Sequence, residues 1–335
     1  MKCLCCGKTI AGTDAAGAAG ATGAGGWHRA CIRRFFGTDR LPVMDISEEN
    51  LMRIAVETTQ KGLTVPGVQK KMSLHLDYGD TPRLTLVNYP TGYILKPQDD
   101  RYPSLPEAEY LVMQMARATG IRTVPFALVQ IPDGERIHRG YITKRIDRIL
   151  PRRADDPVQL LAMEDFCQLD LRLTADKYKG SYERCAGVIT RYSVQPGLDL
   201  SEMFLRLVFS FVSGNSDMHL KNFSLIETAP GSGSYTLSDA YDLLPVNLIL
   251  PEDTEQFALT MNGKKRGLRR NDFIAFAQTI GFPANAAKKL LDHVIGKEDM
   301  YASMITGSLL PAAMKEDFLR LLHDRMLQLR PGHAG

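Results

Sequence analysis

The pattern of apolar and polar positions divides the chain into a strand-rich stretch and a helix-rich stretch. Between residues 63 and 145, short apolar or alternating runs predict strands, at 72–76, 83–87, 92–96, 124–130 and 140–144. One helix interrupts these strands. The capping-box sequence Ser104-x-x-Glu107 predicts its start, and it runs to Thr119 with Gly120 as the stop.

From Met163 onward the pattern is mainly helical. Apolar residues recur at helical spacing over 201–212 and require a buried stripe, and helical patterns return at 272–280, 286–295 and 311–329. One hairpin pattern, formed by 222–226 and 234–239, interrupts the helices. Strands followed by helices, with a hairpin between, predict an α+β fold of the bilobal protein-kinase type. We expect a β-rich N-lobe over 46–145 and a helical C-lobe over 146–335.

The first 45 residues are expected to form a separate segment with a possible metal site. Cys3-x2-Cys6 and His28-x2-Cys31 flank a Gly/Ala-rich stretch, and paired units of this kind can supply a tetrahedral zinc centre with three thiolates and one imidazole. Cys5 is an alternative to Cys3 in a shifted register. The competing interpretation is a reduced, solvent-exposed tail without metal.

The composition is that of an ordinary globular protein. Of 335 residues, 44% are hydrophobic and 24% are charged, and the formal net charge of +3 is too small to indicate nucleic-acid binding by itself. No apolar run reaches the ~18 residues of a membrane span, and the first residues lack the apolar stretch of a signal peptide. We therefore expect a cytoplasmic protein without disulfides and without a membrane partner.

The sharpest chemical signal is the spacing of Asp217 and Asn222, with Asp242 after the hairpin. A phosphoryl-transfer loop needs a carboxylate that orients the incoming hydroxyl and accepts its proton, and an amide oxygen a few residues later that holds a metal ion. Asp242 can supply a second ligand for Mg²⁺, which prefers hard oxygen atoms. Asp and Asn are also common turn residues, so the spacing gains its meaning from the helix before it and the hairpin after it.

A second signal lies in the strand-rich stretch. Lys96 ends an apolar strand, and Glu109 borders the apolar face of the predicted helix. A buried carboxylate needs a partner, so we predict a Lys96–Glu109 ion pair that directs the lysine towards ATP phosphates. For Glu107, on the same helix, we expect a solvent-exposed position.

The third signal is a short turn before the first predicted strand. Gly67 permits a close approach of the backbone to a phosphate, and the amides and lysines that follow could complete a phosphate cradle. An ordinary turn would have the same sequence features, so the motif is weak in isolation.

Four motifs together resemble the HipA family of bacterial toxin kinases: Thr64-Val-Pro-Gly-Val-Gln-Lys-Lys71, Glu164-Asp-Phe-Cys-Gln168, Ser216-Asp-Met-His-Leu-Lys-Asn-Phe-Ser224 and Ala240-Tyr-Asp242. The resemblance runs from about residue 60 to the C-terminal helices. Full-length HipA proteins carry a further subdomain before the phosphate loop. Its absence here is similar to the short HipT type, whose missing subdomain is a separate small protein.

The resemblance implies a role for each matching position. Asp217 would be the catalytic acceptor, Asn222 and Asp242 would hold Mg²⁺, and Lys96 would contact the ATP phosphates beside Glu109. The phosphate loop would comprise Pro66, Gly67, Val68, Gln69, Lys70 and Lys71. The adenine hinge would comprise Lys144, Arg145 and Ile146, acting through backbone groups. Further nucleotide-site positions would be His219, Leu220, Lys221 and Tyr241, with a scaffold role for His219.

The resemblance also implies a substrate and partners. It suggests a serine/threonine protein kinase that acts on an aminoacyl-tRNA synthetase and blocks translation, with antitoxins of HipB and HipS type and with DNA contacted only through the antitoxin. Thr64 stands where the family has an autophosphorylated serine. Two alternatives stay open: a small-molecule kinase of related fold, and a non-catalytic component of a DNA-bound antitoxin complex.

Overall fold

The structure, a computed structural model, describes residues 1–10, 26–44, 71–79, 81–85, 91–133, 136–150 and 157–332. The chain forms two compact units: unit 1 contains 1–110 and 124–159, and unit 2 contains 111–123 and 160–335. The Cys/His segment thus belongs to the same unit as the strand-rich sequence, whereas the sequence pattern places boundaries near 45 and 145. One boundary between the units falls inside a helix, α3 (Leu105–Thr119).

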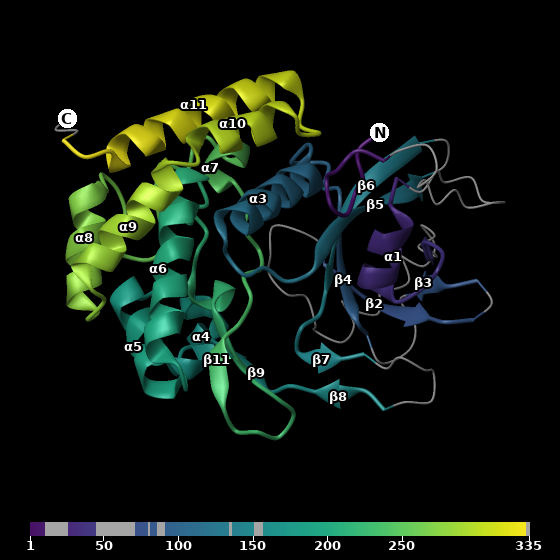
Figure 1. The fold of residues 1–335 in the computed structure, drawn as a ribbon, viewed down its shortest axis with the longest axis horizontal. Coiled ribbons are helices and arrows are strands. Elements are labelled where there is room, and N and C mark those ends of the chain that lie inside the picture. Colours follow the sequence, from purple (N-terminus) through teal and green to yellow (C-terminus); the bar gives the residue numbers. More distant parts are fainter. Residues whose placement is uncertain are drawn as a thin grey trace. The chain divides into compact units, whose positions relative to one another are not determined.

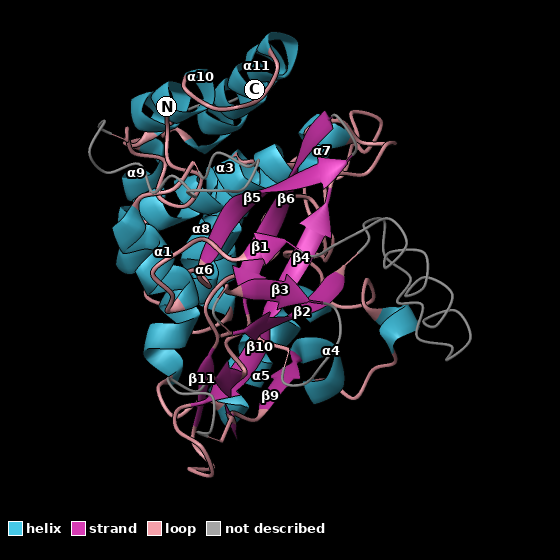
Figure 2. Ribbon diagram, turned by 90° about the vertical axis from the view of Figure 1, so that its right-hand side faces the viewer, coloured by secondary structure: helices cyan, strands magenta, loops and turns pink. Residues whose placement is uncertain are grey.

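Unit 1 is built on a six-stranded sheet, whose order is β1-β3-β2-β4-β6-β5 (Figures 1 and 2). The strands are β1 (Val43–Met44), β2 (Met72–Asp77), β3 (Arg83–Thr85), β4 (Tyr93–Pro97), β5 (Phe126–Asp133) and β6 (Arg136–Lys144). Of the pairs between these described strands, β1–β3 is parallel and the others are antiparallel. The sequence-based strand predictions are confirmed, except that residues 86–87 lie outside the described residues. In β2, Met72, Leu74 and Leu76 are buried in alternation, as the pleat requires.

Among the described residues, helix α1 (Arg29–Phe36) and the first residues of α3 complete unit 1. Helix α1 was not expected from the pattern, and its Phe35 and Phe36 pack with Trp27 and with Tyr93 of the sheet in one aromatic cluster. Helix α3 ends where the sequence predicts, but its predicted capping box is wrong. Ser104 has a φ of 59° rather than the extended conformation of an N-cap residue.

The expectation of a solvent-exposed Glu107 is also wrong. Glu107 is 8% exposed, and its carboxylate accepts a hydrogen bond from Arg139 on β6 at 3.0 Å. The Glu107 carboxylate, which the capping box would have used, is therefore engaged in a tertiary ion pair with Arg139. Arg139 itself keeps contact with solvent.

Unit 2 is helical apart from a three-stranded sheet of order β11-β10-β9. Its strands are β9 (Met163–Asp165), β10 (Ser224–Glu227) and β11 (Tyr235–Leu237), so the predicted hairpin is confirmed and β9 is an additional strand. The helices are α4 (Phe166–Leu169), α5 (Tyr182–Tyr192), α6 (Pro196–Val212), α7 (Val246–Ile249), α8 (Arg270–Thr279), α9 (Ala284–Ile295), α10 (Glu298–Thr306) and α11 (Ala312–Leu329). Shorter pieces of unit 2 are the 3₁₀ helices η1 (Thr174–Asp176) and η2 (Leu220–Asn222). A two-stranded ribbon of β7 (Arg148–Ile149) and β8 (Gln159–Leu160) lies at the end of the unit 1 sequence.

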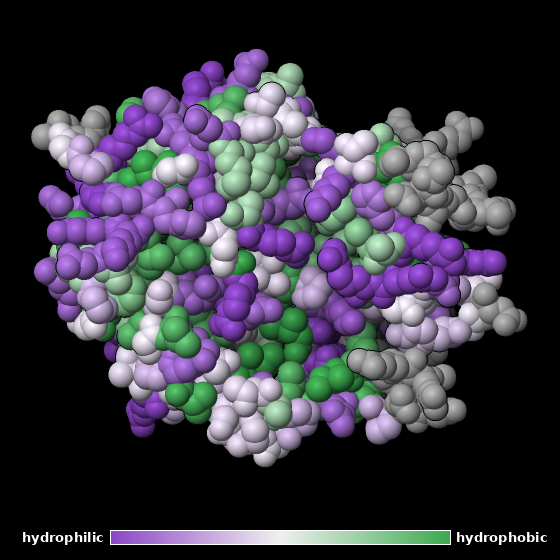
Figure 3. All heavy atoms as spheres, viewed as in Figure 1, coloured by the Kyte–Doolittle hydropathy of each residue, from purple (hydrophilic) through white to green (hydrophobic). Residues whose placement is uncertain are grey.

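The core of unit 2 surrounds α6, in which every residue from Met203 to Val212 is buried. Phe204 packs on Phe276, and Phe211 packs on Phe257 and Phe273. The end of α3 joins this core: the hydroxyl groups of Thr119 and Tyr301 lie 2.6 Å apart. Hydrophilic side chains cover most of the helical face seen in Figure 3. Among the described residues, every helix is too short or too polar to cross a bilayer.

Candidate active site

The loop with the phosphoryl-transfer spacing begins where α6 ends. Gly214 turns the chain with a φ of 69°, which favours glycine, and an added Cβ would lie 2.6 Å from the Leu321 side chain of α11, which would have to move. The Gly214 carbonyl accepts a hydrogen bond from the Asn247 amide at 2.9 Å. Packing against α7 and α11 therefore sets the direction in which the loop leaves α6.

Asp217 and Asn222 are held together by the loop itself. The side-chain amide nitrogen of Asn222 donates to the Asp217 carbonyl at 2.7 Å. Because this contact uses the nitrogen, the amide oxygen of Asn222 is the atom able to ligate a cation. The Asp217 side chain is 44% exposed and accepts a hydrogen bond from the Tyr178 hydroxyl at 2.8 Å. The carboxylate is thus oriented and still open to solvent, which general-base chemistry requires.

His219 lies next to the Asp217 carboxylate. Its Nε2 is 3.9 Å from Asp217 Oδ2, and its ring meets the Tyr178 ring edge to face at 5.1 Å. Burial is the main cause that lowers the pKa of His219, against an opposing pull from the Asp217 charge. The imidazole is therefore neutral at neutral pH and packs as part of the scaffold.

The Glu164–Gln168 motif fixes the other end of the loop. Asp165 caps α4 by accepting from the Gln168 amide at 2.9 Å, and its other carboxylate oxygen accepts from Lys221 at 2.6 Å. Lys221 is thereby engaged within the protein. Tyr241 donates from its hydroxyl to the Lys221 carbonyl at 3.1 Å and lies 2.6 Å from the Ser224 hydroxyl. Lys221 and Tyr241 therefore hold the loop in place, a role that sequence reasoning did not assign to them.

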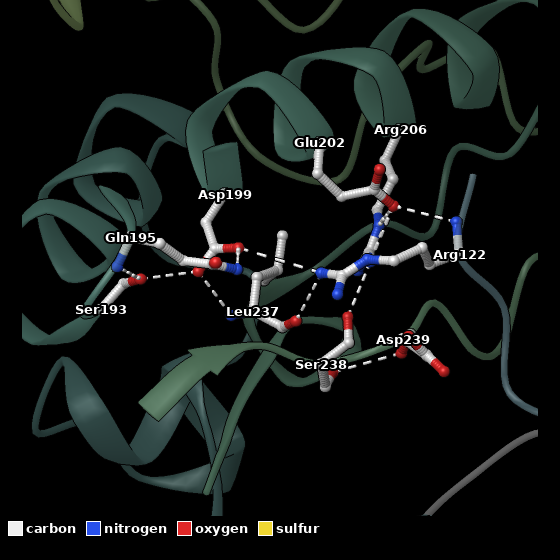
Figure 4. Close-up of polar contacts among 9 residues, drawn as sticks. All are labelled: Arg122, Ser193, Gln195, Asp199, Glu202, Arg206, Leu237, Ser238 and Asp239. Atoms are coloured by element: carbon white, nitrogen blue, oxygen red, sulfur yellow. Dashed lines mark hydrogen bonds and ion pairs between the residues drawn. The ribbon is translucent and has the colours of Figure 1, made fainter. Parts of the chain in front are cut away.

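Asp242 follows β11 in an unusual conformation. Its φ is 55°, in the left-handed region that only Gly, Asn and Asp enter readily. A strained backbone at an acidic residue is often found at functional sites, where the surrounding structure must enforce it. Figure 4 shows the network that holds Leu237 and Ser238, a few residues before Asp242.

The segment before Asp242 is held by two arginines. Buried Arg206, paired with Glu202 at 3.0 Å, donates to the Ser238 carbonyl at 2.7 Å. Arg122 donates to the Leu237 carbonyl at 3.0 Å (Figure 4). Asp199, fully buried, accepts from the Leu237 amide at 2.7 Å and from the Ser193 hydroxyl at 2.6 Å. These contacts join residues far apart in the chain, and no sequence pattern pointed to them.

In unit 1, the structure confirms that Lys96 and Glu109 form an ion pair. The ammonium lies 2.5 Å from Glu109 Oε1, and the two side chains are only 5% and 2% exposed. Strand pairing places Lys96 opposite Tyr141 of β6, and the ammonium lies 5.4 Å from the centre of that ring. The pair is therefore fixed from both sides by the sheet and by α3.

The structure narrows the predicted adenine hinge. The Lys144 amide donates to the Pro125 carbonyl and the Arg145 amide to the Gly92 carbonyl, both at 2.9 Å. The Arg145 guanidinium binds Asp147, and burial lowers the pKa of Lys144. The hinge role of Lys144, Arg145 and Ile146 stays a prediction.

Two further predicted sites differ in how far the structure describes them. Thr64 and residues 66–70 of the predicted phosphate loop lie outside the described residues, and Lys71 is exposed directly before β2. The four predicted zinc ligands, by contrast, come together in unit 1, with ligand atoms within 4.8 Å of one another: Cys3, Cys6, His28 and Cys31.

Comparison with known proteins decides the family. Residues 63–300 match the HipA-like C-terminal domain. The chain belongs to the HipA-like family. This HipA-like chain is 25% identical over 307 residues to a Haemophilus influenzae protein named "Putative kinase", which spans 86% of this chain and 88% of that protein.

Solved structures establish the fold of the HipA-like chain. A chain of the Shewanella oneidensis MR-1 complex of HipA, HipB and operator DNA superposes with a TM-score of 0.65 at 20% identity, over 83% of this chain and 70% of that one. The Helicobacter pylori proinflammatory kinase CtkA gives a TM-score of 0.50 at 14% identity, over 72% and 90%. The predicted α+β, protein-kinase-like fold is therefore confirmed.

Proposed function

We propose that this HipA-like chain is an ATP-dependent kinase that transfers the γ-phosphoryl group to a serine or threonine hydroxyl of a protein. The observation that carries the proposal is the locked Asp217–Asn222 arrangement, in which one carboxylate stays open to solvent beside an amide oxygen. The family and the kinase name of the Haemophilus influenzae relative support it.

Each polar group then has a distinct task. Asp217, oriented by Tyr178, accepts the proton of the attacking hydroxyl. Asn222 and Asp242 would hold Mg²⁺ through their side-chain oxygen atoms, and Lys96, kept in place by Glu109, would contact the phosphates. ATP would supply the phosphoryl group, and Mg²⁺ would supply the charge neutralisation that its transfer needs.

The substrate and partners are proposed from the family. We infer a protein substrate, with an aminoacyl-tRNA synthetase as the leading candidate, and a place in a toxin–antitoxin system of the short HipT type. The Shewanella oneidensis complex contains HipB and operator DNA. By analogy, an antitoxin of HipB type would bind this chain in the cytoplasm and carry any DNA contact, with a HipS-type protein as a further partner.

Radiolabelled ATP tests the function and its alternatives in one experiment. Purified protein should transfer label to itself or to proteins of a bacterial lysate. Label found only in small molecules would replace the protein kinase by a small-molecule kinase. No transfer, from protein that binds nucleotide and is folded, would favour a non-catalytic component of an antitoxin complex.

A second experiment examines whether Thr64 is modified. As part of the proposal, Thr64 is autophosphorylated, and the added charge of about −1.5 to −2 beside the ATP phosphates lowers activity. Phosphopeptide mass spectrometry after incubation with ATP should place phosphate on Thr64. Phosphate on Thr58 or Thr59 instead, with Thr64→Ala unchanged in phosphate content, would contradict this.

We predict that Asp242→Asn weakens Mg²⁺-dependent ATP binding by at least about tenfold, the effect of ~1.4 kcal/mol. Asn tolerates the left-handed φ of this position, so the backbone should keep its shape while one metal-binding charge is lost. Titration calorimetry with and without Mg²⁺ measures the effect. Asp239→Asn, on the same loop, is the control and should retain binding. Equal Mg²⁺-dependent affinity for the Asp242 variant would remove Asp242 from the metal site.

A further inference from the structure

Unit 1 contains a cluster of four side chains with the geometry of a closed metal site. Cys6 Sγ lies 3.4 Å from His28 Nδ1, and Cys31 Sγ lies 3.9 Å from the same nitrogen. With Zn–S and Zn–N bonds of about 2.3 and 2.0 Å, tetrahedral ligands are about 3.5 to 3.8 Å apart. The observed spacings match this arrangement, and all four ligand atoms lie within 4.8 Å of one another.

The surroundings of His28 select the nitrogen that would bind a metal. His28 Nε2 lies 3.2 Å from the Thr9 carbonyl. A carbonyl can only accept, so Nε2 carries the proton and Nδ1, which faces the sulfur atoms, has its lone pair available. A backbone carbonyl that orients a ligating histidine in this way is the usual outer-shell partner of a zinc site.

One of the three sulfur atoms accepts a hydrogen bond from the backbone beside it. The His28 amide points at Cys3 Sγ at 3.4 Å, a contact that favours a charged sulfur. All the cysteines are unpaired. Cys5 is buried nearby but lies outside the cluster, so the register with Cys3 fits the geometry better than the shifted one.

We propose that Cys3, Cys6, His28 and Cys31 hold one structural Zn²⁺ ion, and that this ion fastens the N-terminal segment over the edge of the sheet. Strand β5 is the last strand in the sheet order. Its Leu128 donates from its amide to the Leu4 carbonyl at 2.9 Å and accepts at its carbonyl from the Trp27 indole at 3.2 Å. Leu4 and Trp27 each stand next to a ligand, so the metal joins the two pieces of chain that cover this edge.

Covering the edge matters because exposed strand edges pair with other chains and cause aggregation. The segment also contributes to the core: buried Phe35 and Phe36 pack against Tyr93 of the sheet, and buried Trp27 packs against both phenylalanines. A four-ligand site without an open position contributes folding free energy rather than catalysis. We therefore expect the ion to stabilise unit 1 and to take no part in phosphoryl transfer.

The test is the metal content of the untagged full-length chain, measured by elemental analysis and native mass spectrometry. We expect one zinc per chain, loss of the metal in Cys6→Ala, and retention in the matched control Cys5→Ala. Cys6 is half-buried, so its truncation leaves little cavity. Chelation of the metal should also lower the thermal midpoint and expose the chain to aggregation.

Two results would overturn the proposal. One is the absence of stoichiometric metal in protein purified without chelator, after reconstitution with zinc under reducing conditions has also failed. The other is full zinc retention in both Cys6→Ala and His28→Ala. The outcome is independent of the kinase proposal, because a variant such as Asp217→Asn should bind zinc like the parent chain whether or not the chain transfers phosphate.

Discussion

Replacing Asp217 by Asn is expected to lower phosphoryl transfer by about 10²–10⁴-fold. Asn keeps the shape of Asp and can still accept the hydrogen bond from Tyr178, and the contact with Asn222 involves only the backbone carbonyl. The change therefore removes the proton acceptor without removing the contacts that shape the loop. Initial rates of label transfer from ATP measure the effect.

A matched control separates chemistry from folding. Asp299→Asn makes the same change at an exposed position in the first turn of α10 and should leave the rate unaltered. The thermal midpoint of the Asp217 variant should equal that of the parent within a few degrees. Comparable turnover in the parent and the Asp217 variant would exclude Asp217 as the acceptor.

The second large effect is expected for Glu109→Leu, which removes one partner of a buried ion pair. The Lys96 side chain is 5% exposed, so its ammonium would be left without the carboxylate in a site with little water. Breaking a buried pair in this way costs about 3–5 kcal/mol of the free energy of unfolding. Thermal and denaturant unfolding measure the loss, and nucleotide binding should weaken with it.

Two controls make this prediction specific. Glu107→Leu, on the same helix, leaves Arg139, which is 40% exposed and can turn to water, so its cost should stay below about 1 kcal/mol. The double variant Lys96→Met/Glu109→Leu removes both charges and should recover most of the stability while transfer stays lost. Equal destabilisation by the single and double variants would show that packing, not charge, is responsible.

Local patterns predicted much of the fold and the Lys96–Glu109 ion pair. Alternation and helical spacing located the long elements correctly because each carries its burial pattern in consecutive residues. The Lys96–Glu109 pair was predictable for the same reason, since a strand end and the apolar face of a helix leave both charges in need of a partner. Asn222 was expected in a strand but lies in η2, which turns its amide back to Asp217.

The contacts between distant residues were not predictable. Tyr178 and Asp217 are 39 residues apart, and Lys221 and Asp165 are 56 apart, so only the folded chain brings them together. The capping box predicted at Ser104 does not form, because the Glu107 carboxylate is bound by Arg139 of strand β6. Helix α1 carries only two turns of pattern, and its packing against the sheet, not its propensity, explains why it forms.

The division of α3 between the two units has a consequence for synthesis on the ribosome. All of unit 1 has been made once residue 159 is translated, but residues 111–123 belong to unit 2. The native contacts of Thr119 cannot form until Tyr301 and His293 have been translated; His293 binds the Thr119 carbonyl at 2.8 Å. At ~5–20 residues per second this wait lasts roughly 10 to 30 seconds. During that time residues 111–123, including Val112 and Met115, which are buried in the folded chain, have been made before the rest of unit 2 and are accessible to chaperones.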